Sequence, residues 1–164
     1  MLGKMNNFVI NEQKFKEAHY EYLTTFAYVE TLMSYIISSY FCENNDEKME
    51  FTTTLLMGLS RPRLFQEFLL VLEKMQIQKD EIFSEFVNLN NLRNDFAHSY
   101  FVPKKHNLIK GFEITKIHSS KSYNNQGFVK IIQDNEYNYK INQLNNMKEK
   151  LYNIYINIQY EIKK

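Results

Sequence analysis

The longest regular pattern in this chain is a row of apolar side chains between Glu12 and Cys42 that recur in steps of three and four. The row consists of Phe15, Ala18, Tyr22, Phe26, Val29, Met33, Ile36, Ile37 and Tyr40. Such spacing gathers the apolar side chains on one face of a helix. The pattern therefore predicts a single long amphipathic helix over residues 12–42.

The same spacing predicts four further helices, over residues 46–58, 61–77, 80–102 and 142–163. The first three of these begin beside residues that favour a helix start, namely Asp46, Ser60 and Asp80. Gly58 and Pro103 favour the ends of the first and the third. The fold is therefore expected to be mainly all-α.

Between residues 110 and 141 the spacing changes from helical to alternating. Apolar and polar residues alternate in three short runs, at Phe112 and Ile114, at Val129 and Ile131, and at Tyr137, Tyr139 and Ile141. Residues typical of turns separate these runs, at 119–127 and at 134–135. A small antiparallel β-meander over about residues 110–141 is therefore expected before the last helix.

A single domain over residues 1–164 is expected, because no linker rich in Pro, Gly or Ser divides the chain. Cys42 is the only cysteine, which excludes an internal disulfide and fits a reducing cytoplasm. The first residues lack the apolar stretch of a signal peptide, and no run of 18 apolar residues suggests a membrane span. We expect a soluble cytoplasmic protein that does not contact a membrane.

Charge and motifs exclude several classes of function. The formal net charge of +1 provides no global field that would hold a nucleic acid. The glycines, at positions 3, 58, 111 and 127, form neither a P-loop nor a dinucleotide-binding G-x-G-x-x-G pattern. No H-E-x-x-H, Cys-x-x-Cys or Gly-x-Ser-x-Gly pattern is present either, so we expect no metal, no cofactor and no serine-hydrolase mechanism.

The predicted helix over residues 80–102 carries an arginine on its apolar face. With Ile82 at 0° and about 100° per residue, Arg93 falls near 20°, in the middle of the apolar side chains. A buried and unpaired guanidinium would cost several kcal/mol, so Arg93 needs a partner. The candidates are a phosphate of a ligand and the carboxylates of Glu17, Glu21 and Glu30.

His98 lies about 140° further round the ideal helix than Arg93, on the side that also carries Asn94. Three arrangements would bring His98 and Arg93 together: a distorted last turn before Pro103, a flexible ligand that spans both, or a site shared by two subunits. A purely structural interpretation is equally open. In it, Arg93 pairs with a core glutamate, and His98 stabilises the helix C-terminus by about 0.3–1 kcal/mol as a cation.

The string R-N-D-F-A-H, residues 93–98, resembles the signature of the HEPN (higher eukaryotes and prokaryotes nucleotide-binding) family. That signature is an arginine, often followed by a polar residue, with a histidine four to six residues after the arginine; here four residues separate Arg93 and His98. The predicted helices also resemble the HEPN-like up-and-down helical bundle, whereas the β-meander is the least familiar part. The resemblance implies a metal-independent endoribonuclease that acts as a homodimer in toxin–antitoxin or antiviral (phage-defence) systems.

The side chains of this motif carry the groups that RNA cleavage requires. His98 can act as general base or general acid, a role typically worth about 10²–10⁴ in rate. Arg93 can bind the phosphate, and Asn94 can orient the imidazole or the phosphate. Asp95 or Tyr100 can provide a further proton-transfer group, although structural roles fit them better. Because one subunit offers one clear histidine, a symmetric dimer would supply the second.

A basic segment follows the motif. Residues 101–130 hold six lysines against one acid, Glu113, which makes their charge +5 with neutral histidines. Lys104 and Lys105, together with Tyr100, are therefore possible substrate contacts that can guide an RNA backbone toward His98. An ordinary solvated surface is the alternative.

Two functions are consistent with these residues. The first is a metal-independent endoribonuclease (a hydrolase) that leaves a 2′,3′-cyclic phosphate and has an antitoxin or another inhibitor protein as a partner. The alternative is a non-catalytic HEPN-like module that binds a nucleotide, RNA or a protein.

Overall fold

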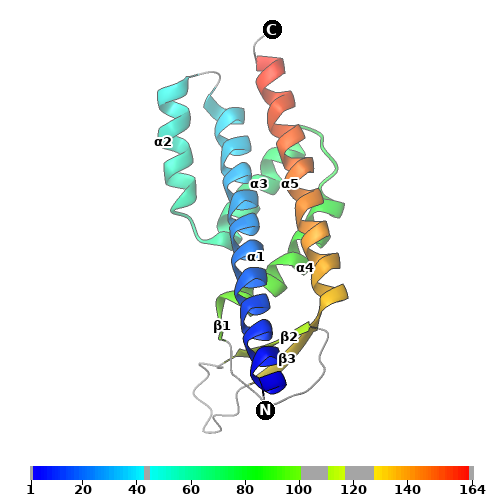
Figure 1. Ribbon diagram of the computed structural model, residues 1–164. Helices are drawn as coiled ribbons and strands as arrows, with labels where there is room; N and C mark the ends of the chain where they lie inside the picture. Colours follow the sequence, from blue (N-terminus) through cyan, green and yellow to red (C-terminus); the bar gives the residue numbers. More distant parts are fainter. Residues whose placement is uncertain (1, 43–44, 101–110, 117–127, 163–164) are drawn as a thin grey trace, which may run out of the picture. The chain divides into compact units, whose positions relative to one another are not determined.

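The computed structural model describes residues 2–42, 45–100, 111–116 and 128–162 (Figure 1). Within these residues the helices are α1 (Leu2–Cys42), α2 (Asp46–Met57), α3 (Arg61–Lys74), α4 (Asp80–Ala97) and α5 (Asp134–Ile162). The short strands are β1 (Ser99–Tyr100), β2 (Gly111–Lys116) and β3 (Phe128–Gln133). The chain is therefore mainly helical, which confirms the predicted class.

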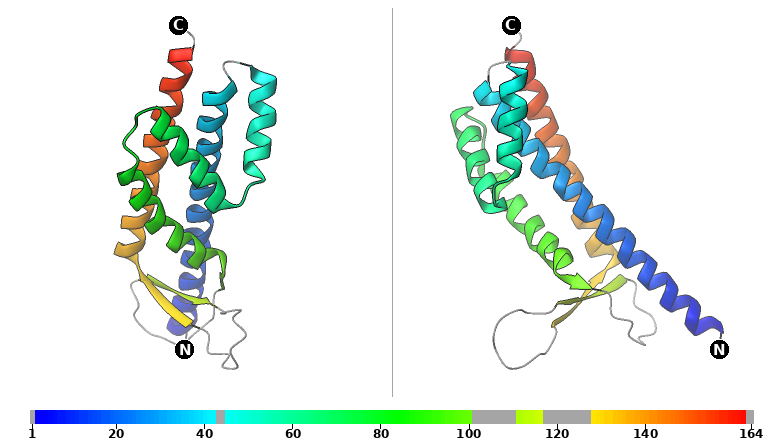
Figure 2. Two further views of the ribbon diagram at one scale, coloured as in Figure 1. Left: turned by 180° about the vertical axis from the view of Figure 1, so that it is seen from behind. Right: turned by 90° about the vertical axis from the view of Figure 1, so that its left-hand side faces the viewer.

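Contacts between residues divide the chain into two compact units. Unit 1 consists of Met1–Thr24 and Asn88–Asn142, and unit 2 consists of Thr25–Val87 and Gln143–Lys164. Helices α1, α4 and α5 each contribute a segment to both units, and Figure 2 shows their continuous course. The candidate residues from Arg93 to Tyr100 all belong to unit 1.

Unit 2 is a bundle to which all five helices contribute. Its largest fully buried side chains are Phe26, Met33, Ile36, Phe68, Leu72, Leu144 and Met147. Phe65 of α3 stacks on Phe86 of α4 with ring centroids 3.9 Å apart, and Phe86 also contacts Phe26 of α1 at 5.4 Å. Aromatic side chains of three helices thus form one continuous part of its core.

Hydroxyl groups connect α2 and α5 to α1 inside unit 2. Thr53 of α2 donates a hydrogen bond to Ser38 Oγ at 2.8 Å, and both side chains are buried. Gln159 of α5 donates to Ser39 Oγ at 2.9 Å. These bonds satisfy polar groups that are removed from water, as a packed interior requires.

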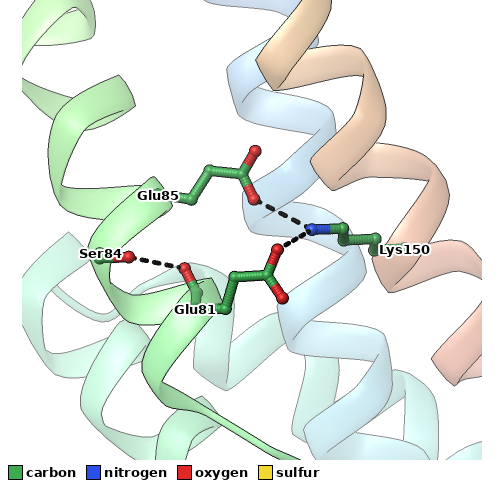
Figure 3. A network of polar contacts seen from close by, with 4 residues as sticks. All are labelled: Glu81, Ser84, Glu85 and Lys150. Carbon is green, nitrogen blue, oxygen red and sulfur yellow. Dashed lines mark hydrogen bonds and ion pairs between the residues drawn. The ribbon is translucent and has the colours of Figure 1, made fainter.

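Lys150 of α5 joins two carboxylates of α4 (Figure 3). Its Nζ lies 3.0 Å from Glu81 Oε1 and 3.4 Å from Glu85 Oε2. The hydrogen bond to Glu81, supported by the charge of Glu85, raises the pKa of Lys150 above its usual value, although desolvation acts the other way. Because the Lys150 side chain is well exposed, this network contributes little to stability.

Unit 1 is built around the fully buried ring of Phe96 in α4. The ring centroid lies 6.5 Å from Phe15, 5.9 Å from His19 and 5.4 Å from Tyr22, all three on α1. On the α5 side it meets Tyr137 edge-on at 6.2 Å. These distances are within the range of favourable ring contacts, so one side chain holds three helices together.

Two tyrosine hydroxyls complete this packing. Tyr22 donates a hydrogen bond to the backbone carbonyl of Leu89 at 3.0 Å. Tyr137 lies within hydrogen-bond distance of Glu21 Oε2, at 2.6 Å, and of the Ala18 carbonyl, at 3.2 Å. Each phenol is thus buried as an apolar ring with its polar atom satisfied.

The short strands also belong to unit 1 and pair antiparallel in the order β1-β2-β3. Tyr100 lies opposite Thr115, and Phe112 lies opposite Ile132. Ile132 is fully buried. One residue, His98, separates the end of α4 from the start of β1, and β3 runs directly into α5.

The predicted end of the fourth helix is wrong. We expected a helix over residues 80–102, but α4 ends at Ala97, and Ser99 and Tyr100 form β1. The run Tyr-Phe-Val before Pro103 explains the difference, because aromatic and β-branched residues favour extended backbone and proline disfavours helix at the residue before it.

The strand predicted at Tyr137, Tyr139 and Ile141 is also wrong. These residues lie in α5, which begins at Asp134 and not near residue 142. Tyr137, Ile141 and Leu144 are buried at helical spacing, and the acids Asp134 and Glu136 favour the start of a helix. The other two predicted runs lie in β2 and β3.

Smaller differences concern helix starts and ends. α1 begins at Leu2, ten residues before the predicted start, and α3 ends at Lys74 instead of residue 77. The cap of α2 is Asn45, whose side chain accepts a hydrogen bond from Lys48 N at 2.9 Å, while Asp46 is the first helical residue.

Among the described residues, no helix is long and apolar enough to cross a membrane.

The packing of Tyr22 and Tyr137 predicts a loss of stability at alkaline pH. Burial raises the pKa of both phenols, and Glu21 raises that of Tyr137 further. The folded protein favours the protonated phenols, so their contribution is complete below the usual pKa of about 10 and is lost as the pH rises above it. Between about pH 8 and 11, we expect urea denaturation to show a steeper decline in the free energy of unfolding for the wild type than for the Tyr22→Phe, Tyr137→Phe double variant.

The exposed Tyr160 provides the control for this measurement. Tyr160→Phe should keep the wild-type decline, because its ring is not part of either core. Parallel declines for the wild type and the double variant would contradict the role assigned to the two buried phenols.

Candidate functional site

The candidate catalytic residues lie on the last turns of α4 in unit 1. Arg93 and Asn94 are half-buried, whereas His98 is exposed and directly follows the last helical residue. The sequence predicted all three on one helix, and the structure places His98 at its end. The imidazole is therefore accessible to a substrate.

The candidate substrate contacts are less well placed by the structure. Tyr100 is in β1, opposite Thr115 of β2, and not on a helix as expected. Lys104 and Lys105 lie outside the described residues. Of the three predicted contacts, the structure therefore locates only Tyr100, two residues after His98.

Arg93 lies at the edge of the buried face of α4 and not at its middle. The buried residues of this helix are Ile82, Phe86, Leu89, Leu92 and Phe96. On the ideal helix Leu92 lies at about 280° and Arg93 at about 20°. Over the last two turns, Leu92 therefore moves the centre of the buried face away from Arg93. Arg93 is left half-buried, so its guanidinium is not enclosed in the core.

The three carboxylates considered as partners of Arg93 have other partners in the structure. Glu30 forms an ion pair with Arg61. Glu21 accepts a hydrogen bond from Tyr137, and Glu17 accepts one from Gln13 at 2.8 Å. Each of these carboxylates therefore has a partner other than Arg93, and Arg93 itself has an interaction within the chain.

The last turn of α4 keeps a helical hydrogen bond. The backbone N–H of His98 donates to the carbonyl of Asn94 at 3.3 Å. This i to i+4 bond continues the helical geometry to His98, so Arg93 and His98 stay about 140° apart. Of the three arrangements considered for joining them, a spanning ligand and a site shared by two subunits remain.

Asn90 extends the polar side of α4 by one turn and was not predicted. Asn90, Asn94 and His98 are spaced by four residues, which places them in one row along the helix. Asn90 Oδ1 is shielded from solvent and has no hydrogen-bond partner within the described part of the chain. An unsatisfied acceptor typically costs about 1–3 kcal/mol, so Asn90 is a further candidate residue of the site. The regular spacing of the three polar residues was its signal in the sequence.

These side chains can bind an anion and transfer a proton. A guanidinium donates parallel N–H bonds to phosphate oxygens, and an exposed imidazole can take or give a proton near neutral pH. Over the ranges that the structure describes, no group of three His, Cys, Asp or Glu side chains lies close enough to hold a metal ion. Arg93 and His98 thus provide an anion-binding group and a proton-transfer group at this site.

Comparison of the chain with models of protein families, with curated proteins and with solved structures found no match. The resemblance to HEPN proteins therefore stays a prediction based on residues 93–98.

Replacing Asn90 by leucine should raise the free energy of unfolding by about 1 kcal/mol, because the unsatisfied oxygen is removed while the side-chain size is kept. Urea denaturation followed by circular dichroism measures the change. Asn91→Leu, at the exposed neighbouring position, is the matched control and should alter stability by less than about 0.5 kcal/mol. A loss of stability in Asn90→Leu would mean that the amide supports the fold.

Proposed function

We propose that this protein is a metal-independent endoribonuclease in which Arg93, Asn94 and His98 act on the scissile phosphate. The observation that carries the proposal is the exposed imidazole of His98 at the end of α4, one turn after Asn94. The order and spacing of the three residues, which resemble the HEPN signature, add further support.

RNA supplies its own nucleophile in this reaction. A neutral imidazole, that of His98, takes the proton of the 2′-OH, and the 2′-oxygen forms a bond to phosphorus. The bond between phosphorus and the 5′-oxygen breaks, and an acid gives that oxygen a proton. The products are a 2′,3′-cyclic phosphate and a 5′-hydroxyl, and no metal or covalent enzyme intermediate is needed.

Arg93 and Asn94 have supporting roles in this mechanism. The guanidinium binds the non-bridging oxygens and offsets the charge that grows on them in the transition state. Asn94 lies one turn before His98, and its amide can orient either the imidazole or the phosphate. Both side chains are half-buried, which restricts their motion and favours a fixed geometry.

A homodimer is part of the proposal. Because the helical bond at His98 keeps its side chain about 140° from Arg93, one copy of α4 does not direct both groups at the same phosphate. A two-fold axis beside α4 would place His98 of one copy near Arg93 of the other. A nuclease of this kind requires control in the cell, so an antitoxin or other inhibitor protein is the proposed partner, in a toxin–antitoxin or phage-defence setting.

The activity is tested by incubating the purified protein with structured RNAs in excess EDTA and identifying the new ends. We expect 2′,3′-cyclic phosphates, and a rate that falls by about 10²–10⁴ in His98→Ala. His118→Ala is the control, because it makes the same exchange at a histidine outside the motif. Undiminished cleavage by His98→Ala would refute the assignment. RNA binding without any cleavage by the wild type would instead favour the non-catalytic module.

Arg93 is tested by two substitutions in the same assay. Arg93→Lys keeps the charge but loses the parallel N–H donors, and Arg93→Met loses both, so cleavage should fall in the order wild type, lysine variant, methionine variant. The methionine variant should lose about 10²-fold or more. Arg63→Lys, at an exposed position on α3, is the matched control and should cleave like the wild type. Equal rates for Arg93→Met and the wild type would remove Arg93 from the site.

A further inference from the structure

His19 of α1 is the other described histidine that lies close to the motif. Its ring is half-buried and meets Phe96 edge-on, with centroids 5.9 Å apart, and it also contacts Phe15 at 5.5 Å. Phe96 is two residues before His98 and three after Arg93. The packing of unit 1 thus brings a second imidazole to the helix that carries the motif.

Segments of α1 and α4 run antiparallel in unit 1. Phe15 contacts Phe96, whereas Tyr22, two turns later on α1, reaches back to the carbonyl of Leu89. Residues 15–22 therefore lie along residues 89–96. Arg93 lies between the two ends of this contact, at the level of His19.

His19 and Arg93 lie on the same side of the seam between the two helices. Viewed from the start of α1, ideal side-chain directions advance clockwise on α1 and anticlockwise on the antiparallel α4. His19 is about 60° ahead of Tyr22 in this sense, and Arg93 is about 60° ahead of Phe96. Because the two rotations have opposite senses, both side chains are directed toward the same side of the contact between the helices.

The opposite side of the seam is covered by α5. There Tyr137 lies within hydrogen-bond distance of Glu21 and of the Ala18 carbonyl. Leu92, which lies about 40° behind Phe96, is buried. His19 and Arg93 are both half-buried, so neither side chain is fully enclosed.

We propose that His19 is a second catalytic histidine, which donates the proton to the departing 5′-oxygen of RNA while Arg93 binds the same phosphate. This inference rests on the proposed ribonuclease function and names its missing acid. The imidazolium of His19 loses its proton to the 5′-oxygen as the bond from phosphorus to that oxygen breaks. The 2′-OH proton goes to His98 of the second copy, so one proton is taken and one is given.

This assignment agrees with the stereochemistry of an in-line displacement. The attacking and leaving oxygens lie on opposite sides of phosphorus, so the base and the acid approach from opposite sides. His19 stands on the α1 side of Arg93, and His98 of its own chain points elsewhere. The second copy then supplies the base from the side of the phosphate opposite to His19.

The test compares His19→Phe with the wild type on two RNA substrates in excess EDTA. Phenylalanine keeps a ring against Phe96 and Phe15 but transfers no proton. The first substrate is ordinary RNA, for which we expect a rate about 10²–10⁴ lower than that of the wild type. The second carries sulfur in place of the 5′-oxygen at one linkage, and a thiolate leaves without a proton, so the variant should cleave it at nearly the wild-type rate.

Controls separate catalysis from folding. His118→Phe should cleave both substrates like the wild type, and the urea midpoint of His19→Phe should match that of the wild type. If His19→Phe does not fold, His19→Gln takes its place with the same expectations. A rate on ordinary RNA equal to that of the wild type, or an equal loss on both substrates, would overturn the role of His19 alone. If the wild type cleaves neither substrate, the ribonuclease function is overturned and this inference with it.

Discussion

The burial of Phe96 holds the end of α4 in place within unit 1. Its ring is fully shielded from solvent and contacts rings from α1 and α5. Burying such a side chain contributes roughly 1.5–3 kcal/mol, and a favourable ring pair adds about 0.5–1.5 kcal/mol. Because Phe96 lies between Arg93 and His98, its packing sets the orientation of both. The geometry of the candidate site depends on this contact.

The end of α4 gives the two main residues of the motif different surroundings. Arg93 is inside the helix and half-buried, so its guanidinium has a limited choice of positions. His98 directly follows the helix and is exposed. A restricted cation suits a constant contact with phosphate, whereas an accessible imidazole suits proton exchange with a substrate or with a second copy.

Local spacing predicted the helices well where only one period fitted the residues. Phe15, Tyr22 and Phe26 are buried on α1 as expected, because a row that mixes steps of three with steps of four cannot stay on one face of a strand. The start of α5 was misread because Tyr137 and Ile141 are four residues apart, which suits both a strand face and a helix face. In the helix, Tyr137 contacts Phe96 and lies within hydrogen-bond distance of Glu21 and of the Ala18 carbonyl. Glu21 and Ala18 are more than a hundred residues away from Tyr137 in the sequence.

The sequence by itself determined the identity and order of Arg93, Asn94 and His98, and helix geometry then determined their angles around α4. Only the tertiary structure decided which of those angles are covered. Leu92 faces the interior and Arg93 its edge, and His19, far away in the sequence, contacts Phe96 of the same helix. The physical reason is that spacing along one helix sets directions about its axis, while burial depends on neighbouring helices that distant segments provide.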